Sequence, residues 1–387
     1  MSAAPSSTAP GAAQGGGIRV MIVDDSVFIR GVLSRWFNGA GEFQVVATHA
    51  NGRKAADDVQ RTQPDVVVLD LEMPDMDGLT ALPLILERKP GTAVLVASAL
   101  SRRGAEISLR ALTLGASDYI PKPDAGNGMA SADEFRDELL AKVRSLGQRV
   151  RRRSVRGAAP VQSGASVSVG TATGSAAAPA AGKLPQKLRS YSMLPVGILA
   201  IGSSTGGPQA LTKVFAEIGP QIGNIPVVIA QHMPPTFTAI LAEHIARAAN
   251  RPCAEGRDGE ELRPGRIYVA PGGLHMVIGR DGDTRIRLKD SPPINFCKPA
   301  VDPLFEAVAT LYGPAALAIV LTGMGSDGAR GALRIAEVGG SVIAQDEETS
   351  VVWGMPGATA NIGACAGILP IGEIGRKINR LIAGGRE

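Results

Sequence analysis

The chain has 387 residues, which is too long for one ordinary hydrophobic core and therefore predicts two domains. Hydrophobic residues make up 44% of the sequence and charged residues 20%, a balance typical of a soluble globular protein. The formal net charge of +4 is small for this length, so charge indicates binding neither to nucleic acid nor to a membrane surface.

The start of the chain and its cysteines indicate a cytoplasmic location. Residues 1–17 are rich in Ala, Gly, Ser and Pro, and they lack the basic region and apolar stretch of a signal peptide. No apolar run reaches the ~18–20 residues that a membrane helix needs. Cys253, Cys297 and Cys365 form no paired motif and are expected to be reduced thiols. We therefore expect a cytoplasmic protein with a disordered tail and no membrane insertion.

Residues 18–147 alternate short apolar runs with helical patterns. Because the runs are almost continuously apolar, they predict a parallel sheet that is covered by helices on both faces. Five such strands fit the flavodoxin-like doubly wound order. The expected strands span 19–23, 44–48, 66–69, 93–97 and 118–120, and the expected helices span 28–36, 53–60, 78–87, 105–114 and 133–147.

The composition changes at residue 148, and residues 148–193 are expected to form a flexible linker. A tract rich in Ala, Gly, Ser, Thr and Pro cannot bury enough apolar surface to offset the entropy lost on ordering. Arginines cluster before this tract. Contact with nucleic acid or acidic lipid is possible there, but a solvated helix end is favoured, because the helix dipole stabilises cations at a C-terminus.

Residues 194–387 resume the strand-helix alternation and predict a second domain, a Rossmann-like three-layer α/β unit. The expected strands span 196–201, 227–230, 267–269, 316–321 and 341–344, with helices at 208–217 and 236–249. A short hairpin is expected at 276–288, around Asp281-Gly282. Both halves are thus expected to be doubly wound parallel-sheet domains.

Acidic side chains follow two of the strands predicted in the first half. Asp24 and Asp25 come after the first strand, and Asp70 ends the third. The ends of these strands should lie together at one sheet edge, where three carboxylates repel one another unless a cation neutralises them. Oxygen ligands of this kind suit Mg²⁺, and a carboxylate such as Asp70 can accept a phosphoryl group. Ser98 and Lys122, at neighbouring strand ends, could contact that phosphate.

The same half resembles the receiver domains of two-component systems. The supporting segments are Val23-Asp24-Asp25-Ser26, the run from Leu69 to Gly78, Ala97-Ser98-Ala99 and Pro121-Lys122-Pro123. The resemblance implies that Asp70 is the phosphoacceptor and that a histidine kinase is the phosphodonor. It also implies a Mg²⁺ site formed by Asp24, Asp25, Asp70 and the backbone carbonyl of Glu72. Ser98 and Tyr119 would be the pair that reorients on phosphorylation.

In the second half, a serine follows the first strand in the turn Gly202-Ser203-Ser204-Thr205-Gly206. A serine on a tight turn that opens a helix projects its hydroxyl from the sheet edge, near backbone N–H groups that can stabilise an oxyanion. A glycine-rich turn of this kind can also bind phosphate. The turn alone does not decide between these readings.

A histidine and an aspartate at two other strand ends favour hydrolysis. His232 directly follows a strand and precedes two prolines, where a general base is expected. Asp327 lies in the turn after a third strand, where it could orient the imidazole. His275, after a Gly-Gly turn, remains a possible base, whereas His244 falls inside a helical pattern. The order Ser, His, Asp differs from the Ser, Asp, His order of α/β-hydrolases, so that fold is not expected.

Residues 194–384 resemble the catalytic domain of the protein-glutamate methylesterases of bacterial chemotaxis. The supporting segments are residues 201–208, 230–235, 268–275, 295–305, 321–328 and 345–355. The resemblance assigns Ser204, rather than Ser203, as nucleophile, His232 as base and Asp327 as orienter. Backbone donors near Thr205 and Met324 are expected to stabilise the oxyanion. Cys297 is expected to be structural.

Together the two resemblances imply a phosphorylation-activated esterase that hydrolyses glutamyl methyl esters on chemoreceptor helices, releases methanol, and deamidates receptor glutamines. Hydrolysis should need no cofactor, and Mg²⁺ would serve only the receiver. The expected partners are the kinase and the methylated receptors, without nucleic acid, and the protein should be a monomer. A transcription regulator is not expected, because the second half is rich in strands. The alternative is a response regulator whose second domain is a non-catalytic binding module.

Overall fold

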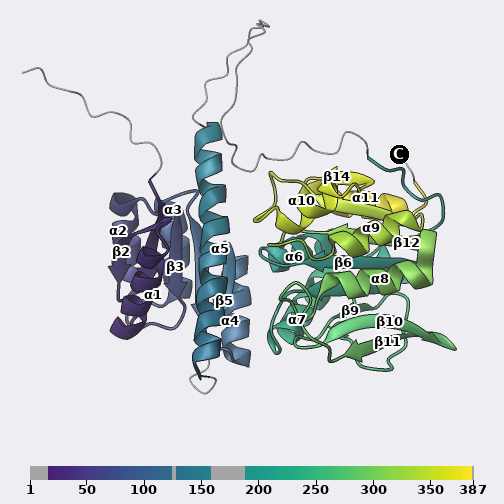
Figure 1. Cartoon of the computed structure of the whole chain (residues 1–387), viewed down its shortest axis with the longest axis horizontal. Helices are drawn as coiled ribbons and strands as arrows, with labels where there is room; N and C mark the ends of the chain where they lie inside the picture. The colour runs from purple at the N-terminus through teal and green to yellow at the C-terminus, as the bar shows by residue number, and fades with distance from the viewer. Residues whose placement is uncertain (1–15, 124–127, 158–187, 386–387) are drawn as a thin grey trace, which may run out of the picture.

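The structure is a computed structural model that describes residues 16–123, 128–157 and 188–385. Most of the expected N-terminal tail and the centre of the expected linker lie outside these residues. Among the described residues, the strands form a five-stranded sheet, a seven-stranded sheet and a two-stranded hairpin. Figure 1 shows the two larger sheets on either side of the long helix α5.

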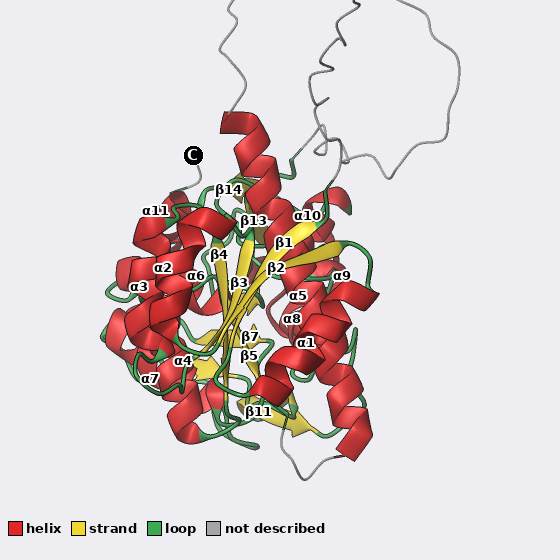
Figure 2. Ribbon diagram, turned by 90° about the vertical axis from the view of Figure 1, so that its left-hand side faces the viewer, coloured by secondary structure: helices red, strands yellow, loops and turns green. Residues whose placement is uncertain are grey.

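The first sheet has the order β2-β1-β3-β4-β5, with every neighbouring pair parallel. This is the predicted flavodoxin-like order, and Figure 2 shows helices on both sides of its strands. Its strands are β1 (Ile18–Val23), β2 (Phe43–His49), β3 (Val66–Asp70), β4 (Ala93–Ser98) and β5 (Asp118–Pro121). Its helices are α1 (Val27–Gly39), α2 (Gly52–Thr62), α3 (Gly78–Arg88) and α4 (Arg102–Thr113).

These four helices begin where a polar side chain can accept a hydrogen bond from an otherwise unpaired backbone N–H group. Each N-cap side chain accepts from the backbone three residues ahead, and the caps are Ser26, Asn51, Asp77 and Ser101. The caps place each helix directly after a strand or a short loop. The loops that follow the strands therefore remain short and hold their polar residues at the sheet edge.

Helix α5 spans Gly128–Gly157, so it is longer at both ends than the predicted helix at 133–147. The part of the expected linker at 148–157 is therefore helical, because arginine is a good helix former even where apolar residues are scarce. Leu139, Val143 and Leu146 are buried against the first sheet. Lys142 anchors the helix through bonds of 2.6 Å to the Asp118 carboxylate and 2.8 Å to the Tyr119 carbonyl.

The second sheet is also fully parallel and has the order β14-β13-β12-β6-β7-β9-β8. Its strand order reverses between β6 and β12, which is the position where ligands bind in open α/β sheets. Its strands are β6 (Ile198–Ser203), β7 (Val227–Gln231), β8 (Cys253–Glu255), β9 (Ile267–Val269), β12 (Ala316–Val320), β13 (Ser341–Gln345) and β14 (Gly367–Leu369).

The hairpin expected around Asp281-Gly282 is present as β10 (His275–Asp281) and β11 (Asp283–Lys289). The longer helices that cover the second sheet are α6 (Gly207–Ile218), α7 (Phe237–Ala249), α8 (Val301–Tyr312), α9 (Ala329–Glu337), α10 (Gly354–Asn361) and α11 (Ile371–Ile382). Single 3₁₀ turns lie at Ile222–Asn224 and Gly313–Ala315. No helix of the described residues is long and apolar enough to span a bilayer.

Candidate functional site

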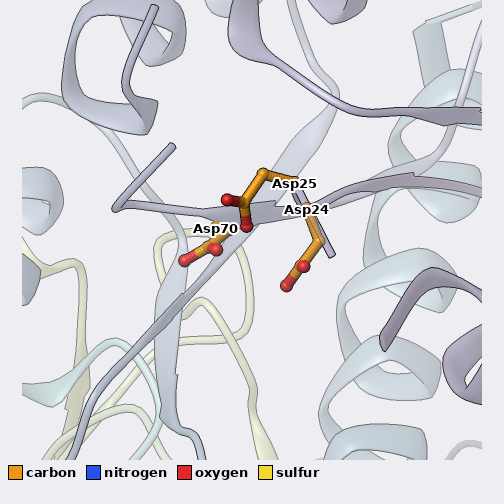
Figure 3. A group of neighbouring side chains, drawn as sticks. All are labelled: Asp24, Asp25 and Asp70. Carbon is orange, nitrogen blue, oxygen red and sulfur yellow. The ribbon is translucent and has the colours of Figure 1, made fainter. Parts of the chain in front are cut away.

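Three carboxylates gather at the carboxyl edge of the first sheet (Figure 3). Asp24 and Asp25 directly follow β1, and Asp70 is the last residue of β3. These strands are parallel neighbours, so their ends meet, and one oxygen from each side chain lies within 4.8 Å of the others. Asp24 and Asp70 are buried, whereas Asp25 is exposed. The predicted carboxylate ligands are thus brought together, with one of them facing solvent.

Lys122 lies against this cluster from the end of β5. Its Nζ is 2.9 Å from Asp24 Oδ2 and 2.7 Å from Asp70 Oδ2. Burial raises the pKa of Asp70 above its usual value, and the ion pair with Lys122 only partly opposes this. One lysine does not neutralise three carboxylates, so the donor set fits a hard divalent cation such as Mg²⁺. The predicted further ligand, the Glu72 carbonyl, belongs to a residue whose N–H donates to Asp70 Oδ1 at 3.3 Å.

The two predicted switch residues are both buried. The Ser98 hydroxyl lies 2.6 Å from that of Ser108 on α4. The ring of Tyr119 stacks on the ring of Phe237 at the start of α7, with centroids 4.9 Å apart and planes 14° apart. Tyr119 therefore forms part of the contact between the receiver domain and helix α7 of the second domain, a contact that the sequence did not predict.

The serine turn follows β6 and opens α6, as predicted. Ser203 is fully buried, and its hydroxyl donates to Gln231 Oε1 at 2.6 Å. Ser204 is partly exposed, and its hydroxyl forms no hydrogen bond with any residue that the structure describes. Gly207 permits this arrangement, because a Cβ there would lie 2.0 Å from Gln231 Oε1. Of the two serines, Ser204 is the one whose hydroxyl is free to react.

His232 and Asp327 form a direct pair at the same edge of the second sheet. His232 follows β7, and its Nε2 lies 2.7 Å from Asp327 Oδ2. Asp327 is buried and also accepts hydrogen bonds from the Val301 and Asp302 N–H groups, at 2.6 and 3.2 Å, in the first turn of α8. Burial alone would raise the pKa of Asp327, but the pair with His232, and after it these two backbone donors, lower it below its usual value. The lowered pKa favours the ionised carboxylate, which is paired with the imidazole.

Comparisons with known proteins identify a family for each half of the chain. Residues 199–378 match the CheB methylesterase family, and residues 20–132 match the response regulator receiver domain family. The protein-glutamate methylesterase/protein-glutamine glutaminase of group 2 operon from Bradyrhizobium diazoefficiens is 52% identical, over 99% of each chain. The protein of the same name from Rhodopseudomonas palustris is 53% identical, over 98% of each chain.

The chain belongs to the CheB methylesterase family. The crystal structure of the Thermotoga maritima CheB methylesterase catalytic domain is 39% identical and covers 49% of this chain and 100% of that chain, with a TM-score of 0.47.

A cysteine that was expected to be structural contacts the histidine. Cys297 Sγ lies 3.2 Å from His232 Nδ1, a contact that the sequence did not predict. Burial alone would lower the pKa of His232, but the Asp327 bond and the Cys297 contact raise it to about 9. Nε2 faces Asp327 and Nδ1 faces Cys297, so among the described residues neither ring nitrogen is hydrogen-bonded to the Ser204 hydroxyl. No sequence signal pointed to the thiol on Nδ1, since the two residues lie 65 positions apart.

Of the two residues predicted to support the oxyanion, Thr205 lies within the serine turn and Met324 lies in the turn after β12. Thr205 is buried, and its carbonyl accepts a hydrogen bond from the Thr322 hydroxyl at 2.9 Å. The sulfur of Met324 accepts a hydrogen bond from the Ser145 hydroxyl of α5 at 3.7 Å. Helix α5, which packs on the receiver sheet, thus contacts the turn that also carries Asp327. We refer to Ser204, His232 and Asp327 as the triad.

The remaining histidines have other contacts. His275 is buried, and Nε2 lies 3.1 Å from the Pro292 carbonyl, while Nδ1 accepts from the Ala300 N–H at 3.1 Å. His275 therefore holds a loop and does not serve as the base that the sequence left possible. His244 lies on α7, and His49 pairs with Asp58 in the receiver.

Proposed function

We propose that this chain is a protein-glutamate methylesterase and protein-glutamine glutaminase of chemoreceptors, controlled by phosphorylation of its receiver domain. The observation that carries the proposal is the His232–Asp327 pair, at 2.7 Å, on the sheet edge that also holds the free hydroxyl of Ser204. Relatives with these two activities in their names match over nearly the full length of the chain.

The chemistry assigned to the triad is acyl transfer. Ser204 Oγ attacks the ester carbonyl as His232 Nδ1 takes the hydroxyl proton, and Asp327 stabilises the resulting imidazolium. The bond to the methoxy group breaks, the imidazolium returns the proton, and methanol leaves. Water then attacks the acyl-serine through the same base, which regenerates Ser204 and a glutamate carboxylate. With a glutamine substrate, the same steps release ammonia instead of methanol.

Control would begin at Asp70, whose carboxylate would accept a phosphoryl group from a histidine kinase. Mg²⁺ bound by Asp24, Asp25 and Asp70 would supply charge neutralisation for the phosphoryl oxygens. Lys122 forms ion pairs with two of these carboxylates, which supports a role in which it would contact the phosphate. Ser98 lies at the end of the neighbouring strand β4, where a hydroxyl could follow the new charge.

The signal would reach the triad through the contacts between the domains. Tyr119 stacks on Phe237, and the Gln209 amide of α6 donates to the Ala116 carbonyl at 2.8 Å. An exposed ion pair of 2.8 Å joins Arg102 of α4 to Glu243 of α7. Phosphorylation can open this interface only to the extent that the phosphorylated receiver binds it less well. We place the domain division at 18–147 and 194–387.

The proposal extends to location and partners. Methylated chemoreceptor helices would be the substrate and a chemotaxis histidine kinase the phosphodonor, and the protein would act in the cytoplasm as a monomer. We propose that the protein neither binds nucleic acid nor inserts into a membrane. Hydrolysis itself is assigned to protein side chains without a cofactor.

The test is methanol release from methylated receptor membranes, with and without acetyl phosphate and Mg²⁺. Release should rise with the phosphodonor and vanish in Ser204→Ala. The control Ser203→Ala removes one buried hydrogen bond, costs about 1 kcal/mol of stability, and should keep reactivity toward a serine-directed fluorophosphonate label. Folded wild-type protein that neither takes the label nor releases methanol would instead support a non-catalytic binding module.

A further inference from the structure

A phenylalanine beside the triad is fully exposed to water. Phe296 lies in the loop between β11 and α8, and its exposed fraction is 103%. Large apolar side chains bury when they can, and aromatic side chains are among the strongest anchors at protein interfaces. The ring remains uncovered although the receiver domain contacts the rim of the same site through Met324.

The loop that carries Phe296 is fastened at its base and on its inner side. His275 bonds to the Pro292 carbonyl and the Ala300 N–H, which closes the two ends of the loop. The Asn295 side chain donates to Asp327 Oδ1 at 3.3 Å, and Cys297 Sγ contacts His232 Nδ1. The residues before and after Phe296 thus both contact the triad, so the ring is held at a fixed place relative to it.

The backbone at the tip is strained to hold this position. Ile294 and Cys297 exchange backbone hydrogen bonds of 3.1 and 2.9 Å around a two-residue turn. The φ angles of Asn295 and Phe296 are 51° and 64°, which is the left-handed pattern of a type I′ turn. Asn is common in such turns, but the second position normally takes Gly. An aromatic residue kept at a position that favours glycine points to a role outside folding.

The polar side chains next to Phe296 are already paired within the protein, so they are poorly suited to bind a polar partner. The ammonium of Lys298 is paired with Asp290, and Asn295 and Cys297 are engaged with the triad. The exposed group at the tip is therefore the apolar ring. A helix that presents a glutamyl ester to Ser204 must pass this rim, and its neighbouring apolar side chains could cover the ring.

We propose that Phe296 is a docking residue that binds an apolar patch of the substrate helix next to the methylated side chain. This inference rests on the function proposed above and names one determinant of its protein specificity. Phe296 touches the protein substrate away from the reacting atoms, so it should govern the KM for receptors and leave the chemical step unchanged.

The experiment compares two substrates in the full chain with acetyl phosphate and Mg²⁺. Phe296→Gly removes the ring and also relieves the positive φ, so it should fold at least as well as the wild type. Its KM for methylated receptor membranes should rise at least tenfold, equal to about 1.4 kcal/mol, with kcat unchanged. Hydrolysis of p-nitrophenyl acetate, which has no helix to dock, should stay at the wild-type rate.

Two controls make the result decisive. Phe296→Leu keeps an apolar side chain and should recover most of the receptor affinity. Ile362→Ala removes another exposed apolar side chain, which is 41% exposed at the end of α10. This variant should hydrolyse both substrates with wild-type kinetics. An unchanged receptor KM in Phe296→Gly, or an equal loss on both substrates, would overturn the docking role. Absence of receptor hydrolysis in the wild type would instead overturn the proposed function.

Discussion

Replacing Cys297 by alanine should shift the pH dependence of ester hydrolysis toward lower pH. The general base must be neutral to accept the Ser204 proton, so activity rises with pH through the pKa of His232. Burial opposes the charged form of His232, but Asp327 and Cys297 together raise its pKa to about 9. Removing the thiol removes one of the two raising contacts. The acidic limb of the kcat/KM profile should therefore move down in pH.

The size of the effect follows from the population of neutral imidazole. With a pKa of about 9, only about 1% of His232 is neutral at pH 7. Each unit by which the pKa falls makes about ten times more of the base available at that pH. The variant also frees Nδ1, which lies 3.2 Å from the thiol in the wild type. Hydrolysis near pH 7 should then rise several-fold, while the plateau at high pH changes little.

The assay is the pH profile of p-nitrophenyl acetate hydrolysis by the full chain between pH ~5.5 and ~10. This range includes both the usual pKa of histidine and the raised pKa of His232, about 9. Cys297→Ser, which keeps a hydroxyl that does not ionise in this range, should shift the limb in the same direction. Cys253→Ala is the matched control, because Cys253 lies on β8 and does not contact the triad. A limb that stays in place in both Cys297 variants would refute the reasoning, since the thiol would then have no influence on the base.

Three further outcomes test the remaining assignments. Asp70→Asn should keep basal methanol release and lose stimulation by acetyl phosphate, and full stimulation would contradict the switch assignment. Tyr119→Ala removes the stack on Phe237, worth about 0.5–1.5 kcal/mol beyond the buried area, and should raise basal hydrolysis up to about tenfold without raising the stimulated maximum. Gly207→Ala places a Cβ 2.0 Å from Gln231 Oε1. It should lower the unfolding free energy by about 1–3 kcal/mol in urea titration and abolish serine labelling, and a stable, reactive variant would contradict the packing described for this turn.

The sequence predicted both parallel sheets because their strands are buried on both faces and read as continuous apolar runs. Strands β3, β4, β7, β12 and β13 are buried along their whole length. Strands β8 and β14 were not predicted. Each has three residues at an edge of the second sheet, too short for a periodic pattern. The edges of the second sheet were therefore less predictable than its centre.

The candidate sites were predictable to the extent that they follow strand ends. Parallel strands bring their carboxyl ends to one edge, so a polar residue after each strand identifies a site without further information. Strand ends predicted His232 and Asp327, which the structure pairs, and the acidic cluster, which it brings together; the choice of Ser204 over Ser203 needed the family resemblance. The sequence did not predict the contacts of Cys297 and His275. These contacts form through a loop, and a loop has no periodic sequence pattern from which its path could be predicted.

The contacts also suggest how a receiver could act on an esterase without touching its nucleophile. Phe237, which stacks on Tyr119, opens α7 only five residues after His232, and the intervening turn contains Pro234 and Pro235. A change in the position of Tyr119 would therefore act on a short, stiff segment that ends at the general base. Helix α5 reaches the other side of the triad through Met324. Opening of the domains would release both sides together, so the free energy available for regulation is limited to the difference in these contacts between the two states. An interface made of a few weak contacts is therefore compatible with regulation, because the binding of one phosphoryl group has to supply enough free energy to open it.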